Sequence, residues 1–302
     1  MNPILIHEVG PRDGLQAEAA VVPTAVKLDW IRRVADCGVD IVQVGSFVRG
    51  DKVPQMADTD ELFRILVPEG HRALLSGLVL NEKGLERALE VGVSLICLGV
   101  SASDTHSRKN TGMGTEEAQR RIIATALAAK QAGRRVQVSV QSAFGCGFEG
   151  AIPEARVLGI VAAYLEAGLT SISLADTAGH AYPEQVRRYV EKTRELDVAA
   201  EVTAHIHDTY GLGMANAYAA MEAGAAAIET SFGGLGGCPF TKVAAGNVAT
   251  EDLVHGLQRM GQRLDIDLNA LVSVSRDVAV HFCRDLPGCV YKTGPIVTKV
   301  QA

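Results

Sequence analysis

The sequence lacks an apolar run close to the roughly 20 residues that a membrane-spanning helix needs. It also lacks an excess of basic charge, because 29 Lys and Arg residues stand against 35 Asp and Glu residues, and the formal net charge is −6. A chain that binds nucleic acid through the phosphates needs the opposite balance. We therefore expect neither a membrane nor a nucleic acid among the partners of this protein.

Closely spaced cysteine pairs and a basic leader are also absent from the sequence. The six cysteines are scattered without a CxxC motif, which argues against a disulfide framework and against a zinc ribbon. Residues 1–10 show neither a basic nor an Arg-rich targeting pattern. These features predict a cytoplasmic protein with reduced thiols. Hydrophobic residues make up 47% of the chain, which is enough for a large core.

What the sequence does contain is a repeated alternation of a short apolar run and a longer helical pattern. The runs are nearly continuous in their apolar character, as expected for parallel strands that are covered on both faces. Eight of them can be counted: Ile4–Val9, Ile41–Phe47, Ala73–Val79, Ser94–Val100, Val136–Ala143, Ser171–Asp176, Val202–Asp208 and Ala227–Phe232.

Eight strand–helix units predict an α/β fold of the (β/α)8 TIM-barrel type. A doubly wound open sheet is the alternative, and it is disfavoured because no GxGxxG motif opens the first helix. After the eighth unit, Asn269–Cys283 is predicted to form an additional helix. We therefore expect a single catalytic domain over 1–302, with the barrel in 1–265 and a C-terminal helical extension in 266–302.

The active site of such a barrel lies at the C-terminal ends of the strands. His205 and His207 are two residues apart at the end of the seventh strand, so both side chains point to one face and can meet one metal ion. Two histidines that are hydrogen-bonded in a core would give the same pattern. Asp13 follows the first strand and is either a third ligand or a turn residue. Asn247 follows the eighth strand and is either an amide ligand or a helix cap.

Two imidazoles, a carboxylate and an amide oxygen favour Mg²⁺ or Mn²⁺, and Zn²⁺ or Co²⁺ is possible. A second feature is the glycine-rich segment at 233–239, which suits a phosphate cradle or a mobile lid. No Lys-Ser/Thr pair follows it in P-loop spacing, which argues against nucleoside triphosphate hydrolysis. Cys238 lies in this segment, either as a lid residue over the barrel mouth or as a small buried hydrophobe.

Several motifs in this order resemble the 3-hydroxy-3-methylglutaryl-CoA lyase family. They are EVGPRDGLQ at 8–16, SFV at 46–48, VPQMAD at 53–58, SLADT at 173–177, HIHDTYG at 205–211, GLGGCP at 234–239 and GNVATEDL at 246–253. The resemblance implies cleavage of the hydroxymethylglutaryl thioester to acetyl-CoA and acetoacetate, an acyl-CoA substrate and a homodimer. It implies a divalent metal ion held by Asp13, His205, His207 and Asn247.

The resemblance also implies that Arg12 lies beside the thioester oxygen and that Cys238 is catalytic. Deprotonating a tertiary alcohol needs a base, for which His205 and Asp13 are the candidates, and the thioester enolate needs a cation such as a guanidinium. The predicted catalytic residues are therefore Arg12, Asp13, His205 and Cys238. The predicted substrate-binding residues are Arg12, Gln16, Gln43, Ser46, Ser173 and Asp176.

Three positions depart from the family pattern. A carboxylate is usual where this chain has Gln43, a lysine where it has Ala19, and a tyrosine where it has Ser139. These changes predict an altered acyl chain in the substrate. The alternative functions are a related barrel aldolase or lyase acting on a different hydroxyacyl-CoA or hydroxy acid, a Claisen-type acyl transferase, and a binding protein that has lost turnover.

Overall fold

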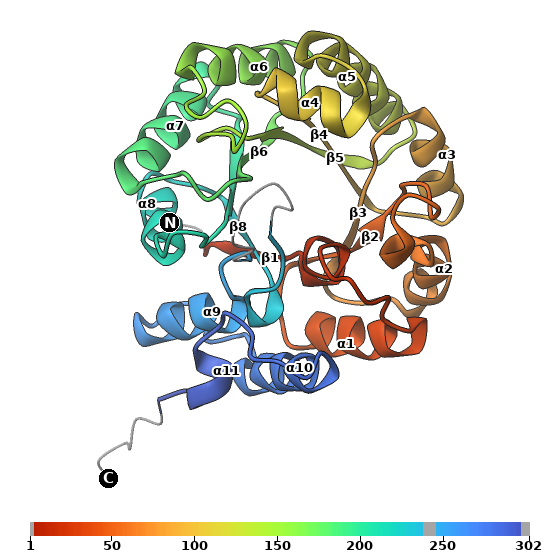
Figure 1. The fold of residues 1–302 in the computed structure, drawn as a ribbon, viewed down its shortest axis with the longest axis vertical. Helices are drawn as coiled ribbons and strands as arrows, with labels where there is room; N and C mark the ends of the chain where they lie inside the picture. Colours follow the sequence, from red (N-terminus) through yellow and green to blue (C-terminus); the bar gives the residue numbers. More distant parts are fainter. Residues whose placement is uncertain (1–2, 238–245, 297–302) are drawn as a thin grey trace.

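The chain folds into a closed barrel of eight parallel strands, as predicted, in the order β1 to β8. The computed structural model describes residues 3–237 and 246–296. Helices surround the strands as a ring (Figure 1). The strands are β1 (Leu5–Glu8), β2 (Ile41–Ser46), β3 (Leu74–Leu78), β4 (Leu95–Ser101), β5 (Arg135–Gln141), β6 (Ser171–Asp176), β7 (Glu201–Ile206) and β8 (Ala227–Thr230). Each lies within about one residue of a predicted run at its start, and the doubly wound alternative is wrong.

One helix of the outer ring follows each strand. These helices are α1 (Thr24–Asp36), α2 (Thr59–Glu69), α3 (Glu82–Glu90), α5 (Thr115–Gln131), α6 (Glu154–Glu166), α7 (Pro183–Leu196), α8 (Gly213–Glu222) and α9 (Thr250–Arg259). A short helix, α4 (Asp104–Thr111), lies in the connection between β4 and α5. Within the described residues, no helix is both long enough and apolar enough to cross a membrane.

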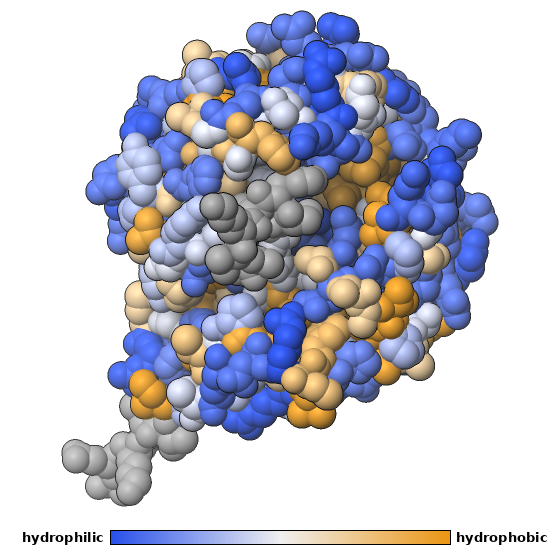
Figure 2. Space-filling view, viewed as in Figure 1, coloured by the Kyte–Doolittle hydropathy of each residue, from blue (hydrophilic) through white to orange (hydrophobic). Residues whose placement is uncertain are grey.

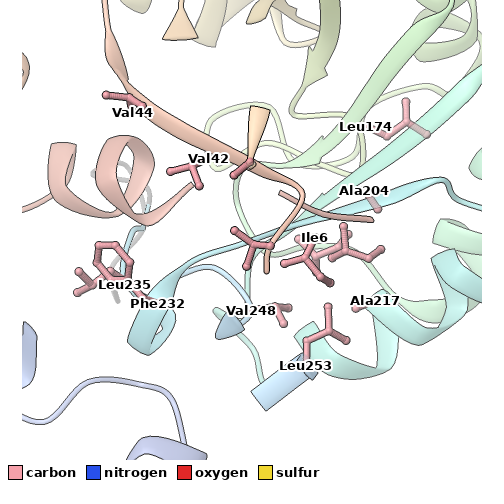
Figure 3. Close-up of a cluster of buried hydrophobic side chains, with 14 of the residues drawn as sticks. Ile6, Val42, Val44, Leu174, Ala204, Ala217, Phe232, Leu235, Val248 and Leu253 are labelled. Carbon is pink, nitrogen blue, oxygen red and sulfur yellow. The ribbon is translucent and has the colours of Figure 1, made fainter. Parts of the chain in front are cut away.

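The main hydrophobic layer lies between the strands and the surrounding helices. Figure 3 shows part of it, with Ile6 and Ala204 on the strands close to Val248 and Leu253. These positions alternate along each strand with side chains that point into the barrel. The interior near the C-terminal ends of the strands is polar, and several of the predicted site residues gather there.

The C-terminal extension consists of α10 (Leu268–His281) and α11 (Val290–Thr293), which lie outside the ring against α1 and α9 (Figure 1). The α10 helix corresponds to the additional helix predicted at Asn269–Cys283. Trp30 of α1 joins the two layers, because its ring packs edge-on against His281 of α10 and against Phe232 after β8. The extension is thereby packed behind the segment that leads from β8 into the glycine-rich region.

Candidate active site

Three ligand-type side chains meet at the C-terminal end of the barrel. The Nε2 atoms of His205 and His207 are 3.0 Å apart. Asp13 Oδ2 lies 3.9 Å from the first of these nitrogens and 3.8 Å from the second. All three ligand atoms thus fall within the 4.8 Å spacing that a single ion can bridge. The two histidines share one face as predicted, although β7 ends at Ile206 rather than at Asp208.

Asp13 reaches this position because the chain turns sharply after β1. In the helical turn η1 (Gly10–Gly14), the amides of Arg12, Asp13 and Gly14 all donate to the carbonyl of Val9, at 3.1, 2.7 and 3.4 Å. A Cβ atom on Gly14 would lie 2.9 Å from Cβ of Leu235, so only glycine fits this close approach. Asp13 is therefore a turn residue that also lies at the position of a candidate ligand, so the two predictions for Asp13 are compatible.

Asn247 joins the site because its segment pairs with the end of β7. His207 and Asn247 lie opposite each other in an isolated antiparallel bridge. The Nδ2 atom of Asn247 donates to Asp13 Oδ2 at 2.8 Å and to the carbonyl of Leu235 at 3.0 Å. Its Oδ1 atom is buried and has no hydrogen-bond partner. The helix-cap alternative is wrong, since the residue that caps α9 is Ala249.

The unpartnered amide oxygen is one observation that supports a cation site. A buried acceptor of this kind normally has a partner, and Asn247 Oδ1 lies on a side chain that already touches Asp13. The Nδ1 atom of His207 is likewise buried without a partner. Two imidazoles, one carboxylate and one amide oxygen form a mixed N/O donor set that fits Mg²⁺ or Mn²⁺.

The charges at the site are set by burial and by close partners. Burial opposes the ionised form of Asp13, but the adjacent Arg12 guanidinium and the contacts with His205 and His207 together outweigh it and hold the pKa of Asp13 well below its usual value. Burial lowers the pKa of His207, which keeps this imidazole neutral. Burial also opposes the charged form of His205, but its hydrogen bond with Glu229 and the nearby charges of Asp13 and Glu229 together outweigh burial and raise the pKa of His205. The site thus combines an anionic oxygen with a neutral imidazole.

Glu229 is a site residue that the sequence analysis missed. It lies on β8, and its Oε2 is 2.8 Å from Nδ1 of His205. Its Oε1 is 3.6 Å from Nδ1 of His7 on β1, and Nε2 of His7 lies 3.0 Å from the Ser76 hydroxyl. The signal for Glu229 was a carboxylate within the apolar run 227–232, where a charge is costly unless it is paired.

Arg12 connects the ligand set to the cavity above it. Its Nη1 donates to Asp13 Oδ1 at 2.5 Å, and its Nε donates to Oε1 of Gln43. The cavity has a volume of about 360 Å³ and is also lined by Gln16 and Ser173. Gln16 Oε1 and Ser173 Oγ are buried without hydrogen-bond partners, so polar atoms in this cavity are available to a ligand. Figure 2 shows that hydrophilic residues predominate at the outer edge of this face, with hydrophobic residues nearer its centre.

The other predicted site residues lie elsewhere. Ser46 is fully buried and does not line the cavity. Asp176 is also outside the cavity lining, and its carboxylate accepts hydrogen bonds from the amides of His180 at 2.8 Å and Ala181 at 3.2 Å. Burial raises the pKa of Asp176 to about 7. Cys238 falls outside the described residues.

The three departures from the family pattern also separate in space. Gln43 and Ser139 both line the cavity. Ala19 is exposed and does not line it. Gln43 is fully buried and accepts a hydrogen bond from Arg12. Among the three departures, it is therefore the one in direct contact with a predicted catalytic residue.

Two buried carboxyl groups hold the start of the glycine-rich segment. Glu8 Oε1 accepts from the amides of Gly10 at 2.6 Å and Phe232 at 3.0 Å. Glu251 Oε2 accepts from the amide of Gly233 at 3.0 Å. Burial raises the pKa of Glu8 to about 7 and that of Glu251 to about 8. Neither role could be predicted from the sequence, because the contacts with Phe232 and Gly233 join segments that are separated along the chain.

Replacing Glu251 with glutamine is expected to stabilise the protein at alkaline pH. The folded pKa of about 8 lies above the unfolded value of 4.5, so the native state binds more protons between these values and loses stability as pH rises through the window. Glu251→Gln keeps the acceptor for Gly233 and removes this loss, which is on the order of a few kcal/mol. Thermal unfolding at pH 5 and pH 9 should show a Tm gain of several degrees at pH 9 and almost none at pH 5. The same Tm difference at both pH values would contradict the assignment.

Comparisons with known proteins identify the family to which the chain belongs. A family model described as HMGL-like matches residues 3–278. An (R)-citramalyl-CoA lyase of Chloroflexus aurantiacus is 36% identical, and the alignment covers 99% of this chain and 98% of that protein. A hydroxymethylglutaryl-CoA lyase of Pseudomonas mevalonii is 37% identical, with 91% of each chain covered.

A solved structure gives the same result in three dimensions. The structure of an HMG-CoA lyase from Acinetobacter baumannii, in complex with coenzyme A and 3-methylmalate, superposes with a TM-score of 0.92. It is 36% identical and covers 99% of this chain and 98% of its own. The chain therefore belongs to the HMGL-like family and is a carbon–carbon lyase.

Proposed function

We propose that the protein is a metal-dependent lyase that cleaves a 3-hydroxy-3-methylglutaryl-CoA-like thioester to acetyl-CoA and a 3-oxo acid, which is acetoacetate for the standard thioester. The observation that carries this proposal is the cluster of Asp13, His205 and His207, with Arg12 bonded to Asp13 at the mouth of the cavity. The names of the curated relatives support it. We also propose that the protein acts as a homodimer in the cytoplasm.

Asp13, His205, His207 and Asn247 would hold a divalent ion, with Mg²⁺ or Mn²⁺ favoured and Zn²⁺ or Co²⁺ as alternatives. When bound, such an ion polarises the C3 hydroxyl of the substrate and lowers its pKa. The base that takes the hydroxyl proton is His205 or Asp13. An imidazole whose Nε2 holds the ion and whose Nδ1 donates to Glu229 has no nitrogen left to accept a proton. Asp13 is therefore the base when His205 is a ligand, and His205 can be the base only when its Nε2 is free.

Breaking the C2–C3 bond leaves a thioester enolate, and Arg12 is the cation placed to stabilise it. A guanidinium has five N–H donors, of which the observed contacts with Gln43 and Asp13 use two. The remaining donors are available to the enolate oxygen. The enolate must then gain a proton, and we propose Cys238 as the donor.

A second candidate substrate has its carboxylate directly on the hydroxyl-bearing carbon, as in citramalyl-CoA, which would give acetyl-CoA and pyruvate. The observation that favours it is Gln43, because a neutral amide beside Arg12 leaves the guanidinium charge without a second protein carboxylate to compensate it. A substrate carboxylate close to the reacting carbon would gain from that charge. The (R)-citramalyl-CoA lyase relative supports this alternative.

The test is a parallel assay of the two thioesters. The purified protein is incubated with Mn²⁺ or Mg²⁺ and either hydroxymethylglutaryl-CoA or (R)-citramalyl-CoA, and acetyl-CoA, acetoacetate and pyruvate are quantified. We expect cleavage that EDTA abolishes, with a clear preference for one thioester. Equal rates on both would contradict altered specificity. Condensation of acetyl-CoA with a 2-oxo acid, without cleavage of either thioester, would indicate an acyl transferase.

Gln43→Glu is expected to change the ratio of kcat/KM between the two thioesters. A carboxylate at this position would compensate the charge of Arg12 and repel a substrate carboxylate near the reacting carbon. We expect the citramalyl thioester to lose about tenfold relative to the hydroxymethylglutaryl thioester, which corresponds to about 1.4 kcal/mol. The matched control is Gln141→Glu, which adds the same charge at the cavity lining on β5. An equal change in the ratio for both variants would argue against a specific role of Gln43.

A further inference from the structure

Glu229 lies between two histidines of the neighbouring strands. The register of the barrel places it opposite His205 of β7 on one side and opposite His7 of β1 on the other. Its Oε2 is 2.8 Å from Nδ1 of His205, and its Oε1 is 3.6 Å from Nδ1 of His7. All three side chains are buried, with Glu229 only 5% exposed. A carboxylate that is buried in a barrel needs such partners, so this row of side chains is a specific arrangement.

We propose that Glu229 is the positioning residue of the candidate metal site. It accepts the proton of His205 Nδ1, which fixes the tautomer and orients the ring so that the Nε2 lone pair faces Asp13 and His207. The inference rests on the proposed function, because it assumes that Nε2 of His205 is a metal ligand. It assigns a role to a residue that contributes no ligand atom itself.

The tautomer of His205 matters because the two histidines are very close together. Their Nε2 atoms are 3.0 Å apart, which is hydrogen-bond distance. If the proton of His205 resided on Nε2, that atom would donate to Nε2 of His207, and both ligand positions would be occupied by one hydrogen bond. A carboxylate at Nδ1 draws the proton of His205 to the opposite side of its ring and leaves the Nε2 lone pair of His205 available to an ion.

His7 and Ser76 extend the same arrangement across the barrel interior. The Nε2 atom of His7 lies 3.0 Å from the Ser76 hydroxyl, which also donates to the carbonyl of Val42 at 3.3 Å. This holds the His7 ring with Nδ1 toward the second oxygen of Glu229. Because Nδ1 of His7 is 3.6 Å from Glu229 Oε1 and makes no hydrogen bond among the described residues, His7 is a weaker neighbour of Glu229 than His205 is, and its removal should have a smaller effect than removal of Glu229.

The experiment measures the binding of Mn²⁺ alone to the full chain by isothermal titration calorimetry. Glu229→Ala removes the acceptor, and we expect the Kd for Mn²⁺ to rise about 10- to 100-fold. Glu229→Gln keeps the size and an acceptor oxygen but loses the charge, and we expect a rise of about tenfold. The glutamine variant also keeps the proposal testable if the alanine variant does not fold. His7→Phe should give a smaller rise than either.

The matched control is Thr203→Val, which removes a buried hydroxyl from the same interior face of β7. Thr203 accepts a hydrogen bond from Gln137 at 3.1 Å and does not line the cavity. Its Kd for Mn²⁺ should stay within about twofold of the wild type. The titration contains no substrate, so it reports on metal binding alone. If Glu229 only supported the barrel, the loss of another buried polar contact in Thr203→Val should weaken Mn²⁺ binding to a similar extent.

Three outcomes would overturn the inference in distinguishable ways. If the wild type binds Mn²⁺ and both Glu229 variants bind it equally tightly, Glu229 does not position His205 and the metal site itself stands. If Thr203→Val weakens binding as much as Glu229→Gln, the effect is a general disturbance of the barrel. If the wild type does not bind Mn²⁺, the proposed metal site is wrong and the inference falls with it.

Discussion

His207→Ala is expected to lower kcat by about 10³-fold or more at saturating substrate. His207 supplies one of the two imidazole nitrogens at the site, and burial lowers its pKa, so it is neutral and able to bind a metal ion at pH 7. Loss of the polarising ion would remove several kcal/mol of transition-state stabilisation, and each 1.36 kcal/mol is a factor of about ten in rate. The substitution removes a neutral side chain and leaves no unpaired charge, so the fold should be retained.

The measurement combines steady-state kinetics at saturating Mn²⁺ with calorimetric Mn²⁺ binding. We expect the fall in kcat to be accompanied by a weaker Kd for Mn²⁺, with an unchanged far-ultraviolet circular dichroism spectrum. His255→Ala is a suitable control, because His255 lies on α9 and does not line the cavity. A His207→Ala variant that keeps kcat within tenfold of the wild type would exclude His207 as an essential ligand.

Much of the fold could be predicted because its signals are local. Apolar runs of strand length, with helical patterns between them, identify a parallel sheet covered by helices. Glycines that follow helices are a further local signal, and Gly38, Gly92 and Gly168 adopt positive φ at helix C-termini. The positions of Asp13, His205 and His207 follow from the rule that strand C-termini converge at one end of a barrel.

The rest of the site depends on contacts between distant segments. The bridge between His207 and Asn247 forms only because the chain returns after the glycine-rich segment to pair with the end of β7. The contact between Glu229 and His205 depends on the register of β7 against β8. A motif within a single segment shows neither the bridge between His207 and Asn247 nor the register of β7 against β8.

Strand alternation was the signal available for Asp176, which lies outside the cavity lining. Asp176 follows Ser173 by three positions, and an odd separation on a regular strand places two side chains on opposite faces. Ser173 lines the cavity, whereas Asp176 is buried outside it. The same rule does not apply to Ser46, because the register of β2 against β3 shifts between Gln43 and Gly45.

Arg12→Lys is expected to lower kcat about 10²- to 10³-fold, with a much smaller change in KM. Lysine keeps the positive charge but lacks the planar fork that lets Arg12 bond to Gln43 and Asp13 at once. Loss of one donor that stabilises a developing oxyanion costs about this factor. The effect should fall on kcat, because the enolate exists only after the substrate has bound. Arg121→Lys on α5, an exposed residue paired with Glu82, is the matched control.

Two measurements separate the possible roles of Arg12. If it acts on the enolate, Arg12→Lys should slow the exchange of the acetyl-CoA methyl protons in D2O by a factor similar to the fall in kcat, while Mn²⁺ affinity changes little. If it acts mainly by orienting Asp13, to which it is bonded at 2.5 Å, Mn²⁺ affinity should fall in parallel with kcat. Asn247 Nδ2 also holds Asp13 Oδ2, at 2.8 Å, so the carboxylate keeps one restraint in the variant. Because this restraint remains, we expect slower exchange of the methyl protons with little change in Mn²⁺ affinity. Full activity in Arg12→Lys would show that a positive charge alone is sufficient at this position.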